Sequence, residues 1–185
     1  MSKIGSKPII IPEAVTVNID DQTVFVKGKE GELKIEVPKV IKIVRQGNQL
    51  VVTTSTDHKK SRSLHGLYRQ LIANAVTGVE KPWTKKLEVV GTGYNVKPQG
   101  EDVVFKLGYS HPVVFKKIPG IKFITEDNNK LTVIGVDKQL VGEIASKIKT
   151  IKKPDSYKGK GIRYVGEKIR LKPSKKVKAT GEGAG

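Results

Sequence analysis

One order of elements occurs twice along this chain, and this repetition restricts the fold more than any other feature. Residues 15–54 alternate apolar and polar side chains, as strands with one buried face do, and residues 61–76 then carry apolar residues at helical spacing. The same order returns over residues 103–134 and 137–151. Landmarks recur at an offset of about 80 positions: Gly28 and Gly108, Pro38 and Pro119, Leu50 and Leu131, and Val52 and Val133. We therefore predict a duplicated unit, with two unrelated modules as the alternative.

Each copy predicts an antiparallel β-sheet covered on one face by one α-helix, so the fold class is α+β with two tandem domains. We place the N-terminal domain at residues 1–81, the C-terminal domain at 82–153, and a basic segment with a flexible tail at 154–185. Trp83 is the only tryptophan, and we expect it to pack at the junction between the domains.

The helices carry local signals for their faces and ends. Gly78 is a candidate C-terminal stop for the first helix, and Asp137 is a candidate N-cap for the second. The apolar face of the first helix is expected to consist of Leu64, Leu67, Leu71, Ile72, Ala75 and Val76.

The basic residues concentrate at the C-terminal end of the chain. The whole sequence has 35 Lys and Arg against 18 Asp and Glu, a formal net charge of +17. Residues 151–185 carry 11 basic and 3 acidic residues, which is nearly half of the excess in the last fifth of the chain. A merely solvated surface would spread this charge, so the clustering favours a nucleic-acid partner.

The segment from Pro154 to Tyr164 combines glycines, cations and tyrosines and lacks apolar periodicity, so we do not expect it to form a core element. Its glycines should bring backbone N–H groups close to phosphate oxygens. Lys158, Lys160 and Arg163 are the strongest candidates for RNA contact. The full candidate set is Tyr157, Lys158, Gly159, Lys160, Gly161, Arg163, Tyr164, Lys168, Arg170, Lys172, Lys175, Lys176 and, in a predicted turn, His111. The alternative is a mobile basic tail that binds any polyanion.

Three further features leave alternatives open. The two tyrosines either stack on a base or sugar or pack the segment back on its domain. Ile169 and Leu171 alternate with Arg170 and Lys172, which suggests a short strand with one basic face. The cations Lys59, Lys60, Arg62 and Arg69 crowd the start of the first helix. A solvated face is the preferred interpretation of that cluster, and a second RNA or protein contact is the alternative.

Catalytic and metal-binding patterns are missing from the sequence. Cysteine is absent, and His58, His65 and His111 are far apart, so no metal or cofactor is predicted. His65 is expected to form a local hydrogen bond or to face RNA. The glycines at 91 and 93 do not continue into a dinucleotide-binding motif, because Val96 stands where its third glycine would be; a bulge or close backbone approach is expected instead. The carboxylate pairs Glu101-Asp102 and Glu126-Asp127 are expected to be solvated. We predict no enzyme.

Several motifs resemble one known family, the sixth protein of the large ribosomal subunit in its bacterial form. Its signature agrees with Pro154, Asp155, Tyr157, Lys158, Gly159, Lys160, Gly161 and Ile162. Residues 4–9, 63–69, 91–94 and 108–113 are similar to other stretches of the family, whereas Lys153 stands where the family usually has a second proline. Thr180 to Gly185 match nothing.

The resemblance implies two similar domains joined end to end and binding to large-subunit ribosomal RNA, mainly through the C-terminal half. It also implies a position near the stalk base and the loop where translational GTPases dock, with stalk-base proteins as neighbours. We expect a cytoplasmic location in the ribosome, no homo-oligomer, and neither a signal peptide nor a membrane span. The alternative function is a freestanding module that binds nucleic acid or another polyanion.

Overall fold

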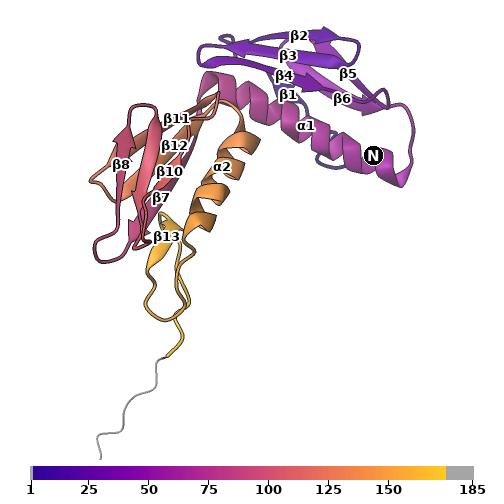
Figure 1. Ribbon diagram of the computed structural model, residues 1–185. Coiled ribbons are helices and arrows are strands. Elements are labelled where there is room, and N and C mark those ends of the chain that lie inside the picture. Colours follow the sequence, from indigo (N-terminus) through magenta and orange to yellow (C-terminus); the bar gives the residue numbers. More distant parts are fainter. Residues whose placement is uncertain (1, 174–185) are drawn as a thin grey trace, which may run out of the picture.

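Alternating apolar side chains build the strands of the first unit, as Val24 and Val26 show by lying fully buried on either side of the exposed Phe25. The computed structural model describes residues 2–173. Its first unit contains β1 (Ile9–Ile10), β2 (Thr16–Asp20), β3 (Thr23–Gly28), β4 (Gly31–Glu36), β5 (Ile41–Gln46), β6 (Gln49–Thr54) and α1 (Lys59–Glu80). These strands form two antiparallel sheets, ordered β1-β6-β5 and β2-β3-β4, and α1 lies along them over one core (Figure 1).

The second unit repeats this order with one addition. It contains β7 (Trp83–Val90), β8 (Asn95–Gln99), β9 (Asp102–Lys106), β10 (Val113–Phe115), β11 (Ile121–Glu126), β12 (Lys130–Gly135), α2 (Lys138–Ile151) and β13 (Gly161–Tyr164). Its sheets are ordered β8-β9-β10 and β11-β12-β7-β13, and they share a second core with α2. The predicted pair of tandem α+β units is confirmed, although each unit holds two antiparallel sheets where we expected one.

The added strand comes from the basic segment. β13 pairs antiparallel with β7, in a register that sets Gly161 opposite Val90 and Tyr164 opposite Leu87. Ile162 is completely buried in the second core. The expectation that this segment contains no core element is therefore wrong for residues 161–164. A four-residue edge strand with one buried side chain is too short to show apolar periodicity in the sequence. The strand expected around Ile169 to Lys172 is also wrong, since residues 167–173 have no regular secondary structure.

The first helix does not end where its sequence suggested. α1 continues past Gly78 to Glu80, and Gly78 is buried inside it. A Cβ at this position would overlap the carbonyl oxygen of Val136 and would lie 2.8 Å from Nε1 of Trp83. The glycine therefore permits close packing against the second unit. Leu67, which we placed on the apolar face, is instead half exposed.

Local signals at the second helix and at the junction are confirmed. The Asp137 side chain accepts a hydrogen bond of 2.8 Å from the backbone N–H of Gln139, as an N-cap does. Trp83 packs at the junction, where its Nε1 donates to the carbonyl oxygen of Asn74 over 3.1 Å. The ammonium of Lys138 lies 4.3 Å from the centre of the Trp83 ring and 3.4 Å from Oδ1 of Asn74. Side chains of both units thus fix their contact.

Replacing Gly78 tests the close contact between the units. We expect Gly78→Ala to lower the free energy of unfolding by about 1–3 kcal/mol, because the new methyl group must displace backbone. The matched control is Gly142→Ala in α2, where a Cβ would meet no atom within 4 Å; helix propensity alone should make that variant more stable by about 0.5–1 kcal/mol. Urea unfolding measures both changes. Equal stability of the two variants would contradict the packing argument.

Candidate nucleic-acid interface

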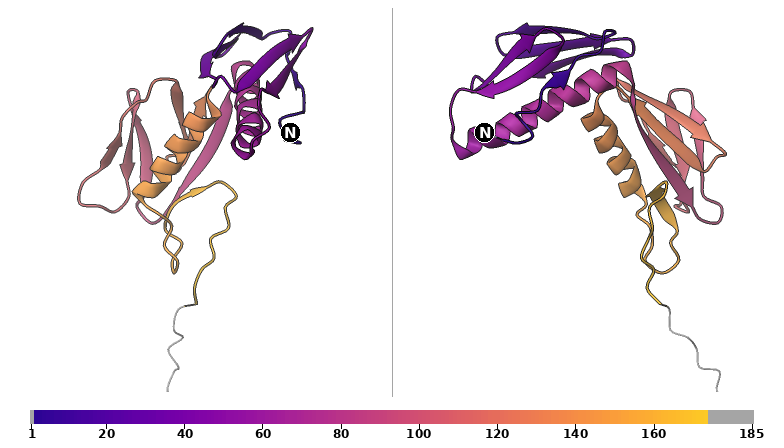
Figure 2. Two further views of the ribbon diagram at one scale, coloured as in Figure 1. Left: turned by 90° about the vertical axis from the view of Figure 1, so that its right-hand side faces the viewer. Right: turned by 180° about the vertical axis from the view of Figure 1, so that it is seen from behind.

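Three loops meet at the end of the second unit that lies farthest from the first unit (Figures 1 and 2). They are residues 91–94, residues 108–112 and the segment that follows α2. Lys160 places its ammonium 3.3 Å from Oγ1 of Thr92, which joins the first loop to the third. Tyr109 donates its hydroxyl to the carbonyl oxygen of Ile151 over 2.9 Å, and the ammonium of Lys152 lies 4.3 Å from its ring. The sequence therefore brings its candidate loops together in space.

A turn built on Asp155 orders the glycine- and lysine-rich segment. Its carboxylate oxygen Oδ2 accepts from the backbone N–H of Lys158 at 2.8 Å, and its carbonyl oxygen accepts from that of Gly159 at 2.9 Å. The Asp155 N–H donates to the carbonyl oxygen of Lys160 over 2.9 Å. The hydrogen bond from the Lys158 amide lowers the pKa of the Asp155 carboxyl below its ordinary value of 3.8. We expected the backbone N–H groups of this segment to reach phosphate, but those of Lys158 and Gly159 are already used within the turn.

The two glycines of this segment have structural roles. Gly159 has a φ of 68°, which favours glycine. At Gly161 a Cβ would lie 2.7 Å from both the carbonyl oxygen of Lys153 and Cα of Pro154, so two backbone segments cross there without room for a side chain. The glycines thus shape the turn that carries the lysines.

The candidate cations divide into paired and unpaired groups. Arg163 is half buried, with its Nε 3.2 Å from Oε2 of Glu88. Lys160 is half buried beside Thr92. In contrast, four cations are exposed and form no ion pair within residues 2–173: Lys158, Lys168, Arg170 and Lys172. Lys175 and Lys176 lie outside the described residues. The unpaired group can still neutralise phosphate.

An open groove of about 630 Å³ lies beside these cations. Lys158, Arg163 and Lys168 contribute to its polar lining, and Ile169 and Leu171 contribute apolar surface. The chain returns past the Asp155 turn here, because the N–H of Lys172 donates to the carbonyl oxygen of Ser156 over 2.8 Å. Residues 167–173 thus have no regular secondary structure but are hydrogen-bonded to the Asp155 turn.

The two candidate tyrosines have different surroundings. Tyr164 packs on the second core, and the ammonium of Lys149 lies 4.8 Å from its ring. Glu167 accepts hydrogen bonds from Lys149 at 2.6 and 2.7 Å and from the Tyr164 N–H at 3.0 Å. These hydrogen bonds lower the pKa of the Glu167 carboxyl, and the bond from Lys149 has the largest effect. Tyr157 is 59% exposed and is the one of the two that can stack on a base.

The structure also separates the roles of the histidines. His111 is exposed in the loop of residues 108–112, with Nδ1 3.4 Å from Oγ of Ser110. His65 is fully buried, and its Nε2 lies 2.8 Å from the carbonyl oxygen of Val52, so the local hydrogen bond is confirmed and the RNA-facing alternative is wrong. The close approach expected near residue 91 is present, because a Cβ at Gly91 would lie 2.5 Å from the ring of Tyr94.

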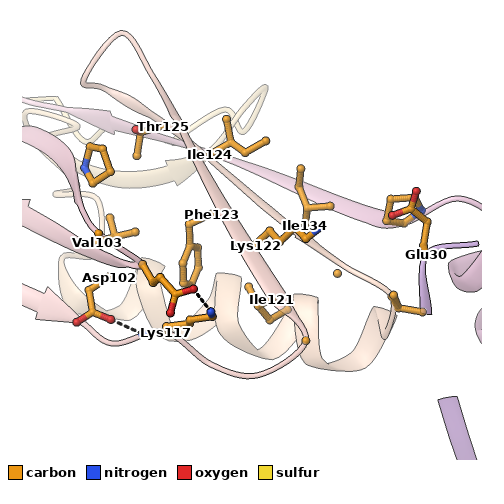
Figure 3. Close-up of a pocket in the computed structure, with 17 residues that line it drawn as sticks. Glu30, Asp102, Val103, Lys117, Ile121, Lys122, Phe123, Ile124, Thr125 and Ile134 are labelled. Atoms are coloured by element: carbon orange, nitrogen blue, oxygen red, sulfur yellow. Dashed lines mark hydrogen bonds and ion pairs between the residues drawn. The ribbon is translucent and has the colours of Figure 1, made fainter. Parts of the chain in front are cut away.

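A separate apolar hollow of about 570 Å³ lies against β11 and β12 (Figure 3). Phe123, Ile124 and Ile134 supply much of its lining. Three carboxylates line it, those of Glu30, Glu101 and Asp102. Glu101 forms an ion pair with the ammonium of Lys117, and Oδ1 of Asp102 accepts from the Lys117 backbone N–H at 2.7 Å. Within residues 2–173, no group of three or more His, Cys, Asp or Glu residues is arranged to hold a metal ion. The loops at the end of the second unit remain the candidate site.

Sequence reasoning missed the residues that hold the site in place. Asp155 precedes Lys158 by three positions and could have been recognised as a turn-forming side chain. Glu88 and Lys149 lie far along the chain from their partners, and no local signal indicated their pairing.

A comparison with protein families identifies a related family. The model of the family described as Ribosomal protein L6 matches residues 11–81 and 90–165. The two matched segments correspond to the two repeated units, and the second includes the Asp155 turn and β13.

The Asp155 turn makes a pH-dependent prediction. Because its folded pKa is depressed below 3.8, the carboxylate stabilises the turn above that value and loses this effect as the pH falls through the folded pKa. We expect the NMR shift of the Lys158 amide to titrate with a midpoint below 3.8, and Asp155→Asn to abolish this titration. A midpoint at or above 3.8 would contradict the hydrogen bond to the charged carboxylate.

Proposed function

The chain belongs to the ribosomal protein L6 family and is therefore an RNA-binding constituent of the large ribosomal subunit; from this premise we propose which part of it binds the RNA. The contact surface consists of the three loops at the end of the second unit. Lys158, Lys168, Arg170 and Lys172 neutralise phosphates there, and Lys160, Arg163 and His111 line the same end.

The observation that carries this proposal is a set of exposed cations that form no ion pair within residues 2–173: Lys158 lies on the Asp155 turn, and Lys168, Arg170 and Lys172 lie on the segment that is hydrogen-bonded to it. The nearby carboxylates of Glu88 and Glu167 are engaged by Arg163 and Lys149, so they do not compete for the exposed cations. Apart from the Asp155 carboxylate, which accepts from the Lys158 N–H, the remaining charge is positive and faces solvent beside an open groove. Such a surface suits a partner whose negative charges are closely spaced, and ribosomal RNA is that partner.

Binding at this surface would be mainly electrostatic. Each phosphate that a lysine or arginine neutralises releases counterions. This release contributes to the free energy of binding and makes the affinity depend on salt concentration. Tyr157 offers a face for stacking on an unpaired base or a sugar. Because double-stranded RNA hides its base edges in a deep major groove, recognition of helical elements would depend on shape and backbone geometry. The mechanism is structural, and we assign no catalytic role.

We further propose a location near the stalk base and the docking region of the translational GTPases, with the ribosomal proteins of the stalk base as neighbours and the cytoplasm as the compartment. Support for this placement comes from the family resemblance of the signature at Pro154–Ile162. Within residues 2–173, no helix has the length and apolar character needed to cross a membrane. The competing function is a freestanding polyanion binder.

Salt dependence tests the proposed surface. We expect the combined change of Lys158, Lys168, Arg170 and Lys172 to Gln to reduce the magnitude of the slope of log affinity against log salt by about three, since each lost phosphate contact removes about 0.7–0.9. The control changes four exposed lysines of the same unit, Lys97, Lys106, Lys116 and Lys122, to Gln. Filter binding to deproteinised large-subunit RNA at several salt concentrations measures both. Equal slopes for the two variants would contradict the assignment.

Sedimentation distinguishes the ribosomal function from the freestanding one. We expect the chain to co-migrate with the large ribosomal particle in a lysate gradient, and to remain there at salt concentrations that remove loosely held basic proteins. Recovery at the top of the gradient, or release from all nucleic acid at mild salt, would instead support the polyanion binder.

A further inference from the structure

We propose that the end of the first unit farthest from the second unit is another RNA-binding site. It consists of the four lysines Lys3, Lys7, Lys59 and Lys60, which we call the distal basic surface. Figure 1 shows the N-terminus and the first turn of α1 together at this end, on the opposite side of the molecule from β13. That the partner is RNA rests on the proposed function, whereas the position of the surface is argued from the structure.

The N-terminal segment is fixed against α1 by several contacts. Arg69 donates from Nε to the carbonyl oxygen of Lys7 over 3.1 Å and from Nη2 to that of Pro8 over 3.2 Å. A Cβ at Gly5 would lie 2.5 Å from the buried His65 ring, so the backbone rests directly on this side chain. Residues 2–8 therefore hold a defined position on the helix, and Lys3 and Lys7 are held with them.

Helical spacing places part of the lysine cluster on the face that this segment covers. Lys59, Arg62, Gly66 and Arg69 follow one another at intervals of three and four residues, which puts them on one side of α1. A Cβ at Gly66 would lie 3.1 Å from Oγ of Ser2, which confirms that the N-terminal segment lies along this side. Lys3 and Lys7 thus lie on the same side of α1 as Lys59, with the carbonyl of Lys7 bound to Arg69, and Lys60 follows Lys59 in the first turn of the helix.

The arginines of this region form hydrogen bonds and ion pairs within the protein, whereas the lysines form no ion pair within residues 2–173. Arg62 donates from Nε and Nη2 to the two carboxylate oxygens of Asp57 at 2.9 and 2.8 Å, and this pairing lowers the pKa of Asp57 to about 2. All four lysines are exposed and form no ion pair within residues 2–173. The first turn of α1 contains no acidic residue. The charges of these four lysines are therefore available to an approaching polyanion.

The composition of the surface favours RNA over an acidic protein. Lysine is depleted in protein–protein interfaces, whereas it is a common point-charge ligand of phosphate. Ile4 and Leu67 are exposed on the same two segments, so an acidic protein is the competing partner and becomes an outcome of the test.

Two cationic surfaces at opposite ends would let one chain join two RNA elements. Once the second unit is bound, the distal surface meets its own RNA at a high effective concentration, because the contacts of Gly78, Trp83 and Lys138 hold the units together. The first unit would then act as an arm that fixes the spacing between RNA elements.

Directed RNA cleavage tests the position of the surface. The chain has no cysteine, so Lys60→Cys or Lys158→Cys provides a single attachment point for a hydroxyl-radical reagent in the full-length protein. In reconstituted large-subunit particles we expect two separate sets of cleavages in the large-subunit RNA, one from each position. The control, Lys27→Cys, lies on the exposed side of β3 and should cut weakly or not at all. Cleavage from Lys60→Cys no stronger than this control would overturn the proposal.

Charge removal tests whether the surface contributes to binding. We expect the combined change of Lys3, Lys7, Lys59 and Lys60 to Gln to reduce the magnitude of the salt slope on deproteinised large-subunit RNA by about three. The control changes Lys27, Lys29, Lys39 and Lys42, which are exposed on the strands and turns of the same unit. Circular dichroism and urea unfolding check that both variants fold.

The outcomes separate this inference from the proposed function. An altered slope for the distal variant with an unaltered slope for the variant of Lys158, Lys168, Arg170 and Lys172 would support the distal surface and reject the proposed site. The reverse result would reject only the distal surface. If the distal variant binds deproteinised RNA normally but is lost from the large particle in a gradient, the partner is a protein and the RNA inference is wrong.

Discussion

The pairing of β13 with the edge of β7 is the interaction on which the candidate interface depends. It places Ile162 in the second core, where full burial of an isoleucine contributes about 1.5–3 kcal/mol, and satisfies backbone groups on an otherwise open edge. The Asp155 turn on one side and residues 165–173 on the other are thereby attached to a folded sheet. A cationic segment held in this way loses less conformational freedom on meeting RNA than a mobile tail would.

Carboxylates near the interface stabilise the basic segment without neutralising its outer surface. Glu88 pairs with Arg163 on adjacent strands, and Glu167 binds Lys149 and the backbone of Tyr164. Both pairs are only partly exposed, so solvent screens them less than it screens a pair on the open surface. The inner cations therefore serve the fold, and the outer ones are available to a partner. The sequence does not distinguish these two groups of cations, whereas the structure separates those that form ion pairs from those that face solvent.

Much of the fold could be predicted because its signals are local. Alternation identified the strands, and Asp137 caps its helix as its position indicated. The errors came from contacts between distant segments. In the sequence Gly78 resembles a helix stop, but in the structure it allows Val136 and Trp83 to pack closely against the helix. β13 has no recognisable sequence pattern, and it forms a strand because it pairs with the edge of β7. The same holds for the candidate site, since the pairing of Arg163 spans 75 positions.

The difference between the two repeated units can be traced to one strand. In the first unit β1 has two residues and pairs only with β6, and Ile10 on it is 68% exposed. Its counterpart β7 has eight residues and pairs with β12 on one side, which leaves a long edge on the other. That edge is long enough to accept β13, whereas the two residues of β1 are not. A longer edge strand thus allows the second unit to hold the basic segment on its sheet.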